Sequence, residues 1–152
     1  MDDRDLVSIQ EARTLAHAAR EAQIALAELT QAEIDSIVES MASAATQHAE
    51  ALARIAVDET GYGVAADKVQ KNLFSSKQVY EFIKPIKTVG VINRLPERRV
   101  VEIAEPFGVV AAIVPSTNPT STAIYKILIA LKARCAVIVS PHPKATRCIT
   151  RT

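Results

Sequence analysis

Two short apolar runs, separated by a helical stretch, constrain the fold of this chain more than any other feature. Residues 109–114 and 136–139 lack the polar–apolar alternation of a half-exposed strand, as is typical of parallel strands buried on both faces. Between them, residues 120–133 repeat apolar side chains at helical spacing. A strand, a helix and a strand in this order predict two parallel strands joined by a crossover. We therefore expect an α/β fold with a parallel sheet.

The sequence also indicates how far this sheet extends. Parallel strands need cover on both faces and further strands beside them. The next helix should begin after Pro143, shortly before the sequence stops at Thr152. We therefore expect an incomplete sheet in residues 105–152, with apolar surface that leads to self-association or requires a partner fragment.

Residues 1–87 predict a helical segment. Helices are expected over residues 6–29, from the Thr30 capping box to residue 59, and over residues 65–83, with Gly61 ending the second. The positions expected to face inwards in the last two helices are Ile34, Ile37, Val38, Met41, Ala45 and Leu52, then Val69, Leu73, Phe74, Val79 and Phe82.

Residues 88–104 predict a β-hairpin between the helical segment and the parallel sheet. Strands are expected at residues 88–93 and 99–104, with the turn at residues 95–97. Val100 and Ile103 alternate imperfectly with charged neighbours, which is typical of a half-exposed hairpin.

Charge and cysteine content exclude several classes of protein. The net charge is +1 and the basic residues are scattered among acidic ones, so we expect no nucleic-acid partner. No apolar run is long enough to span a bilayer, and the mostly acidic start, Asp-Asp-Arg-Asp at residues 2–5, does not fit a secretory leader. Cys135 and Cys148 have no metal-ligand spacing. We therefore expect no metal site, no membrane contact and a cytoplasmic location.

Three segments together resemble one enzyme family. Residues 105–110 (Glu-Pro-Phe-Gly-Val-Val) lead into residues 115–122 (Pro-Ser-Thr-Asn-Pro-Thr-Ser-Thr), which is the most specific of the motifs. Residues 58–63 (Asp-Glu-Thr-Gly-Tyr-Gly) with 67–69 (Asp-Lys-Val), and residues 140–143 (Ser-Pro-His-Pro), agree with it. Together they resemble the CoA-acylating branch of the aldehyde dehydrogenase superfamily, which includes aldehyde–alcohol, acetaldehyde and sulfoacetaldehyde dehydrogenases.

The resemblance extends over about residues 55–150 and implies the amino-terminal part of such an enzyme. It implies a Rossmann-like cofactor domain, here incomplete, and a hairpin arm at residues 88–104 that joins subunits of a homo-oligomer. The implied reaction oxidises an aldehyde, with sulfoacetaldehyde and acetaldehyde as candidates, to an acyl-CoA. NAD or NADP is the implied cofactor and CoA the co-substrate.

The loop at residues 115–119 is the candidate ligand site, because ligands of open α/β sheets bind outside the carboxyl ends of the strands. For Ile113 and Val114 the alternative is plain sheet core, and for His142 it is a solvated loop position. The resemblance implies cofactor contacts for the strand ends and this loop, at Ile113, Val114, Pro115, Ser116, Thr117, Ser140 and His142.

Asn118 is the candidate oxyanion donor. In the superfamily a Pro-Trp-Asn-Phe-Pro loop occupies this place, and its Asn donates to the oxyanion of the reaction intermediate. Pro115 and Pro119 have the same separation here, but Thr117 is the positional equivalent and Asn118 falls one place later. The alternative for Asn118 is a helix N-cap that accepts from the backbone of Ser121.

Neither cysteine is expected to be the nucleophile of the reaction. Cys135 precedes a buried strand and has no adjacent base, whereas Cys148 lies near a helix start, a setting that lowers a thiol pKa. The resemblance places the family's nucleophilic cysteine downstream of Thr152. We therefore predict that the chain alone is inactive. The alternative is a non-catalytic helical binding or interaction module derived from this family.

Overall fold

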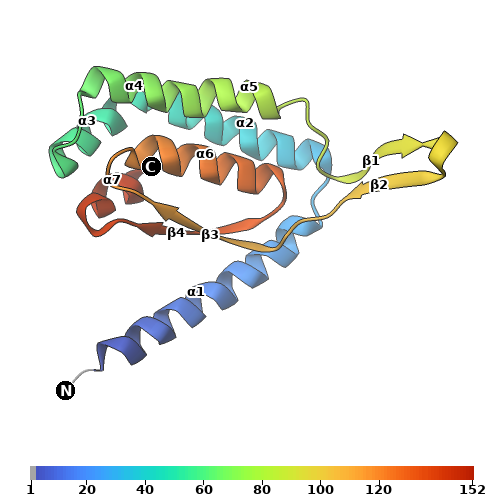
Figure 1. Ribbon diagram of the computed structural model, residues 1–152, viewed down its shortest axis with the longest axis horizontal. Coiled ribbons are helices and arrows are strands. Elements are labelled where there is room, and N and C mark those ends of the chain that lie inside the picture. Colours follow the sequence, from blue (N-terminus) through green and yellow to red (C-terminus); the bar gives the residue numbers. More distant parts are fainter. Residues whose placement is uncertain (1–2) are drawn as a thin grey trace.

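The computed structural model describes residues 3–152 and arranges them in layers around two parallel strands (Figure 1). The helices are α1 (Arg4–Ala27), α2 (Gln31–Gln47), α3 (Ala49–Thr60), α4 (Ala65–Leu73), α5 (Val79–Ile83), α6 (Pro119–Lys132) and α7 (Thr146–Arg151). The strands are β1 (Gly90–Leu95), β2 (Val100–Ala104), β3 (Val109–Val114) and β4 (Ala136–Pro141). This mixture of helices, a hairpin and a βαβ unit confirms the expected α/β class.

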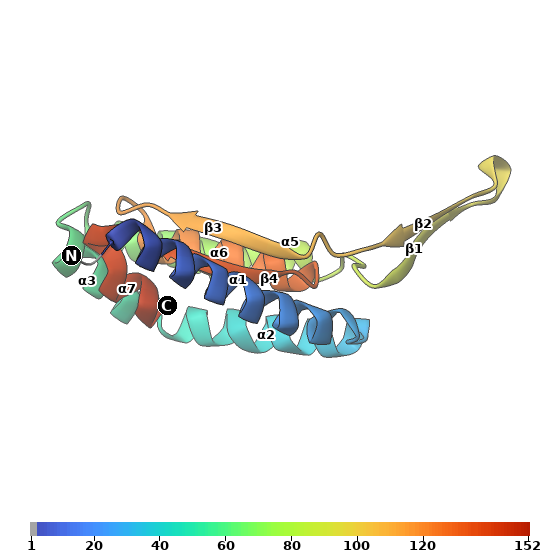
Figure 2. The same ribbon diagram turned by 90° about the horizontal axis from the view of Figure 1, so that it is seen from below.

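The parallel pair forms as the apolar runs predict. β3 pairs with β4 from Val109 opposite Ala136 to Val114 opposite Pro141. Helix α6 connects the two strands and packs on one face of the pair, while α1 contacts the other face (Figures 1 and 2). Helices α2, α4 and α5 pack on the side of α6 that faces away from the strands.

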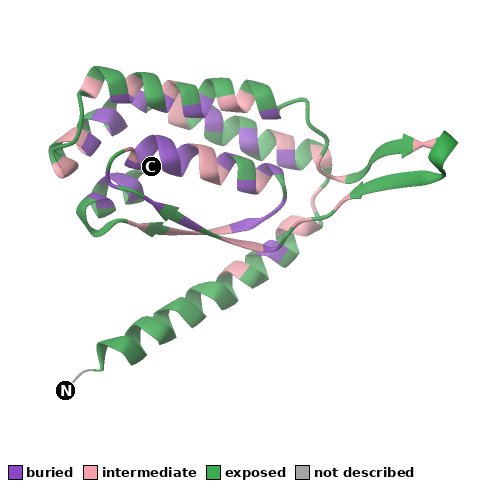
Figure 3. Ribbon diagram, viewed as in Figure 1, coloured by how far each residue is buried: buried purple, intermediate pink, exposed green. Residues whose placement is uncertain are grey.

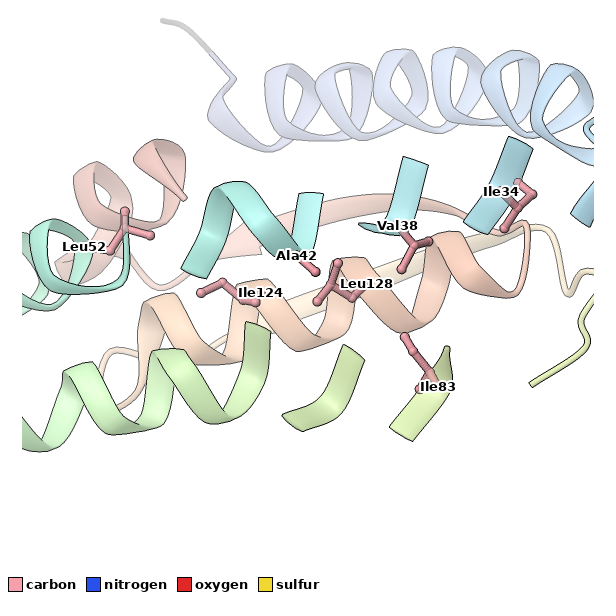
Figure 4. Packing of buried hydrophobic residues seen from close by; sticks show 7 residues of the cluster. All are labelled: Ile34, Val38, Ala42, Leu52, Ile83, Ile124 and Leu128. Atoms are coloured by element: carbon pink, nitrogen blue, oxygen red, sulfur yellow. The ribbon is translucent and has the colours of Figure 1, made fainter. Parts of the chain in front are cut away.

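The main apolar core lies between α2 and α6. Their buried side chains interdigitate there with one residue each from α3 and α5 (Figure 4). The members of this cluster are Ile34, Val38, Ala42, Leu52, Ile83, Ile124 and Leu128. A second cluster joins β3 to α3, α6 and α7, and contains Ala56, Val114, Ala123, Ala145, Cys148 and Ile149. The carboxyl end of β3 is therefore fixed by three helices.

The second predicted helix is two helices, which corrects the expected continuous element to residue 59. The capping box is present, since Thr30 Oγ1 accepts from the Glu33 N–H and the Glu33 carboxylate accepts from the Thr30 N–H. The helix breaks at His48, whose φ and ψ are −96° and 5°. The break turns α3 so that Leu52 reaches the main core and Ala56 the second cluster. Gly61 ends α3 in a left-handed conformation, as expected.

The inward face of the third predicted helix is different from the expected one. The chain is helical from Ala65 to Ile83 without a gap, but Phe74–Gln78 is a π-helical segment between α4 and α5. Phe74 and Phe82 are exposed, while Lys68, Asn72, Ser75 and Ser76 are buried. In the preceding helix, Ile37 and Met41 also lie at the surface. Lys68, Asn72 and Ser76 can face inwards because they have hydrogen-bond partners on other elements. Ser76 Oγ, for example, accepts from Thr46 Oγ1 at 2.9 Å.

Strand β3 is buried on one face only, which corrects the prediction of cover on both faces. Ala112 and Val114 point into the helices, whereas Ala111 and Ile113 are exposed, Ile113 at 73%. The reason is that α1 covers only part of this face: residues 4–18 of α1 are all exposed (Figure 3). Apolar α1 residues at helical spacing, such as Ile9 and Leu15, therefore stay in solvent.

The hairpin of β1 and β2 projects away from the rest of the molecule (Figures 1 and 2). The strands are antiparallel, with Val91 opposite Ile103 and Leu95 opposite Val100, and a 3₁₀ turn at Pro96–Arg98 joins them. The expected hairpin is confirmed, with its strands beginning and ending within two residues of the predicted bounds. Within residues 3–152, no helix combines the length and the apolar character needed to cross a membrane.

Candidate functional site

The loop at residues 115–118 lies where the two parallel strands end. It follows Val114, and α6 begins directly after it at Pro119. The chain after β4 passes beside it, because the backbone N–H of His142 donates to the carbonyl of Val114 at 2.9 Å. Ile113 lies opposite Ser140 in the strand pairing, so both side chains point to the same face. The candidate residues from both strand ends therefore lie together.

The first turn of α6 is tied to α4 by a buried asparagine. Asn72 is fully buried, and its Oδ1 accepts a hydrogen bond of 2.7 Å from the Thr120 hydroxyl. Its Nδ2 donates to the carbonyl of Ala49 at 2.9 Å. Both polar ends of the amide are satisfied without water. Asn72 thus connects α3, α4 and α6 at the point where the loop becomes a helix.

Two lysines of α4 contact the loop itself. Lys68 Nζ donates to the carbonyl of Thr117 at 2.8 Å, and Lys71 Nζ donates to Asn118 Oδ1 at 2.9 Å. Lys68 is only 4% exposed, whereas Lys71 is at the surface. Burial lowers the pKa of Lys68 because it disfavours the charged form, and the positive charge of Lys71 lowers the pKa further by repulsion. Lys68 is therefore buried at a position that disfavours its own charge, with the end of its side chain next to Gly63.

Asn118 does not cap α6, which corrects the alternative role considered for it. It occupies the N-cap position, but its side chain makes no capping hydrogen bond to Ser121. Its Oδ1 instead accepts from Lys71. Its Nδ2 donates to no residue within 3–152, which leaves the two amide protons available to a ligand. Asn118 is half-buried.

Cys148 is held as a protonated thiol. It is fully buried, and its Sγ–H donates to the carbonyl of Ala145 at 3.3 Å. Burial raises its pKa to about 12, and the nearby carboxylate of Glu59 raises it as well. That carboxylate accepts from the backbone N–H groups of Arg147 and Cys148 at 2.8 and 2.6 Å. The expectation that a helix start lowers the pKa of this thiol is therefore wrong.

The other candidate groups lie as follows. Cys135 is buried and precedes β4, at the end of the strand away from the loop. His142 is exposed, and its Nδ1 accepts from the N–H of Lys144 at 3.1 Å. Pro115 and Thr117 are exposed, while Ser116 is buried. Within residues 3–152, no three His, Cys, Asp or Glu side chains are grouped as metal ligands would be.

This arrangement can stabilise a negative charge, but the described residues supply no nucleophile beside it. The NH₂ group of Asn118, which donates no hydrogen bond to residues 3–152, belongs to the residue at the N-terminus of α6, where backbone N–H groups also favour an anion. A thiolate is missing from the neighbourhood because both cysteines are buried away from solvent. These are the parts of an oxyanion site without its attacking group.

The sequence profile of the aldehyde dehydrogenase family matches residues 6–152. The chain belongs to the aldehyde dehydrogenase family. It is 44% identical over 140 residues to the bifunctional aldehyde-alcohol dehydrogenase AdhE of Escherichia coli K12, covering 92% of this chain and 16% of that enzyme. It is 42% identical over 128 residues to the acylating sulfoacetaldehyde dehydrogenase of Cupriavidus necator, covering 83% of this chain and 26% of that enzyme.

Solved structures agree with this aldehyde dehydrogenase assignment. The acetylating aldehyde dehydrogenase of Geobacillus thermoglucosidasius superposes with a TM-score of 0.94 at 56% identity, over 99% of this chain and 33% of that one. The resemblance to acylating members of the family is thus confirmed. The chain spans between 16% and 33% of the length of these three relatives.

Several residues of the candidate site were not singled out from the sequence. Glu59 and Lys68 belong to the segments that carried the resemblance, so the signal was present without a role attached to it. Thr120 also lies in one of these segments, and Lys71 and Asn72 lie beside another, but the importance of all three comes from contacts between positions 47 and 48 residues apart.

Proposed function

We propose that this chain is the amino-terminal part of a CoA-acylating aldehyde dehydrogenase. The whole enzyme converts an aldehyde, CoA and NAD(P)⁺ to an acyl-CoA, NAD(P)H and a proton. Residues 1–87 are the helical segment of the cofactor domain, residues 88–104 an oligomerisation arm, and residues 105–152 the start of the cofactor-binding sheet. The observation that supports this proposal most strongly is the free amide of Asn118 at the carboxyl end of β3.

In this proposal Asn118 stabilises the oxyanion of the tetrahedral intermediate. A cysteine thiolate adds to the aldehyde carbon, and the carbonyl oxygen takes up the negative charge. Asn118 Nδ2 donates a hydrogen bond to that oxygen, and the N-terminus of α6 adds its partial positive charge. The carbonyl re-forms as hydride leaves the carbon, and the thiol of CoA then displaces the cysteine from the thioester. Neither buried cysteine of this chain can serve as that nucleophile.

The residues at the strand ends fit a nicotinamide cofactor. Ile113 offers an exposed aliphatic surface next to Ser140 on the same face, as a flat ring and its ribose require. When bound there, NAD or NADP accepts the hydride. Ile113 and Val114, with Pro115, Ser116, Thr117, Ser140 and His142, would hold it, Val114 through its backbone because its side chain is buried. Short aldehydes such as acetaldehyde and sulfoacetaldehyde are the candidate substrates, and the relatives named as acylating or acetylating support CoA as the acceptor.

The chain alone is expected to have no dehydrogenase activity, because it lacks an accessible thiolate. The test follows NADH absorbance with the purified chain, acetaldehyde or sulfoacetaldehyde, CoA and NAD⁺ or NADP⁺. The matched control is a chimera in which this chain replaces the corresponding 33% of the Geobacillus enzyme. We expect no signal from the chain and turnover from the chimera. Steady NADH production by the chain, or a folded chimera without activity, would contradict the proposal.

The hairpin is proposed to bind a second copy of the chain. Val91, Val101 and Ile103 lie on one face of it and are exposed, which is costly for a two-stranded ribbon in water. Light scattering of the chain should therefore give a mass above the 16.4 kDa of a monomer. Ile103→Lys should lower that mass, whereas Val100→Lys, on the opposite face, should not. Equal masses for both variants and the unaltered chain would argue against an oligomerisation arm. None of the contacts described above favours the alternative function, a non-catalytic helical binding module.

A further inference from the structure

Two lysines one helical turn apart on α4 hold two consecutive residues of the candidate loop. Lys68 and Lys71 lie on the same side of the helix, and their Nζ atoms reach the Thr117 carbonyl and the Asn118 amide oxygen. Both contacts join residues that are 47 to 49 positions apart in the sequence. The loop is thus held by α4, a helix that is not part of the unit formed by β3, α6 and β4.

The chemistry of the two groups decides how the Asn118 amide points. An ammonium group can only donate hydrogen bonds, whereas a carboxamide has one accepting and one donating end. The oxygen of Asn118 must therefore face Lys71, and the NH₂ group must face away from it. Without Lys71, rotation about the last side-chain bond would exchange the two ends. The oxygen would then face a developing oxyanion, which it repels.

We propose that Lys71 is a positioning residue that fixes Asn118 as a hydrogen-bond donor, and that Lys68 anchors the same loop through the Thr117 carbonyl. This inference rests on the proposed oxyanion role of Asn118. The two lysines differ in burial and in the group that each one contacts. Lys68 is buried and serves the backbone, so it also supports the fold, whereas Lys71 is exposed and touches the functional side chain. Lys71 can therefore be replaced without opening the core.

The orientation of Asn118 is tested on the chain itself by NMR. The chain contains three asparagines beside six glutamines, so three of its nine side-chain NH₂ groups belong to asparagine, and two of these three serve as references. Asn72 is fully buried with both ends bonded, and Asn93 is exposed on the hairpin. In the unaltered chain, the ¹H–¹⁵N heteronuclear NOE of the Asn118 NH₂ group should be close to that of Asn72. In Lys71→Met it should fall to the value of Asn93.

Two further variants make this measurement specific. Lys71→Arg keeps a cationic donor and should restore the ordered value. Lys77→Met removes an exposed lysine from the same continuous helix and should leave Asn118 unchanged, because the Lys77 side chain bonds to none of residues 3–152. The backbone signals of the core confirm that each variant is folded. An Asn118 amide that stays ordered in Lys71→Met would overturn the proposal.

Kinetics of the chimera then separate this inference from the proposed function. Lys71→Met should lower kcat about tenfold with KM little changed, and Lys71→Arg should recover most of the loss; the full loss of an oxyanion donor is about 10²–10³. If Asn118→Ala lowers kcat but Lys71→Met does not, Lys71 has no positioning role and the oxyanion assignment stands. If neither variant lowers kcat, the oxyanion assignment itself is wrong, whatever the NMR result.

Discussion

Asn72→Leu is expected to lower the free energy of unfolding by about 2–4 kcal/mol, because leucine fills the space but makes no hydrogen bond. The Thr120 hydroxyl and the Ala49 carbonyl would each lose a partner of the fully buried amide. A buried polar group left without a partner costs about 1–3 kcal/mol. Urea unfolding of the chain, followed by far-ultraviolet circular dichroism, measures this difference.

A matched control and a double-mutant cycle locate the effect. Asn93→Leu makes the same chemical change on the exposed hairpin and should alter the unfolding free energy by less than about 0.5 kcal/mol. Thr120→Val removes the hydroxyl that Asn72 accepts from, so the double variant should be less destabilised than the sum of the single ones. Additive effects would show that the two residues do not act as one unit.

The parallel unit was predictable because its signal is local. Short continuous apolar runs are typical of strands that pack against other elements, and the helix between them carries its own apolar face. The observed bounds of β3 and α6 agree with the predicted ones within one residue. The hairpin and the Thr30 capping box were equally local, and both formed. In each case, neighbouring residues determine the structure.

The buried face of α4 and α5 could not be predicted in this way. Phe74 and Phe82 are large apolar residues of this helical stretch, and hydrophobic spacing predicts that they face inwards, yet both are exposed. Lys68, Asn72 and Ser76 face inwards because their partners come from the 115–120 segment, from Ala49 and from Thr46. These partners are distant in the sequence, so no periodicity reveals them. The break at His48 likewise has no local signal, and its effect is that Leu52 and Ala56 of α3 reach clusters formed by residues distant in the sequence.

The position of the candidate site could be predicted from the topology, but the orientation of Asn118 and the pKa shift of Cys148 could not. The carboxyl end of a parallel strand is a ligand site in open α/β sheets, and that placed the loop correctly beside Ser140 and His142. The orientation of Asn118, however, depends on Lys71 of another helix. Likewise, the setting of Cys148 depends on Glu59 of α3, which reverses the pKa shift expected for a helix start.

Helix α4 links the stability of the fold to the geometry of the site. Lys68, Lys71 and Asn72 lie within two turns of it, and each contacts the 117–120 segment. The buried amide of Asn72 fixes where α6 begins, and the two lysines fix the loop just before it.

The kcat of the Asn118→Ala chimera tests the oxyanion assignment most directly. Removing the amide donor of Asn118 should lower kcat by about 10²–10³ and leave KM nearly unchanged, since the lost hydrogen bond strengthens only in the transition state. Thr117→Val is the comparison variant, because Thr117 is the residue at the family's Asn position. It removes a proposed cofactor contact, so it should raise the KM for the cofactor but keep kcat within about threefold. An Asn118→Ala chimera with unaltered kcat, or a loss confined to Thr117→Val, would contradict the assignment.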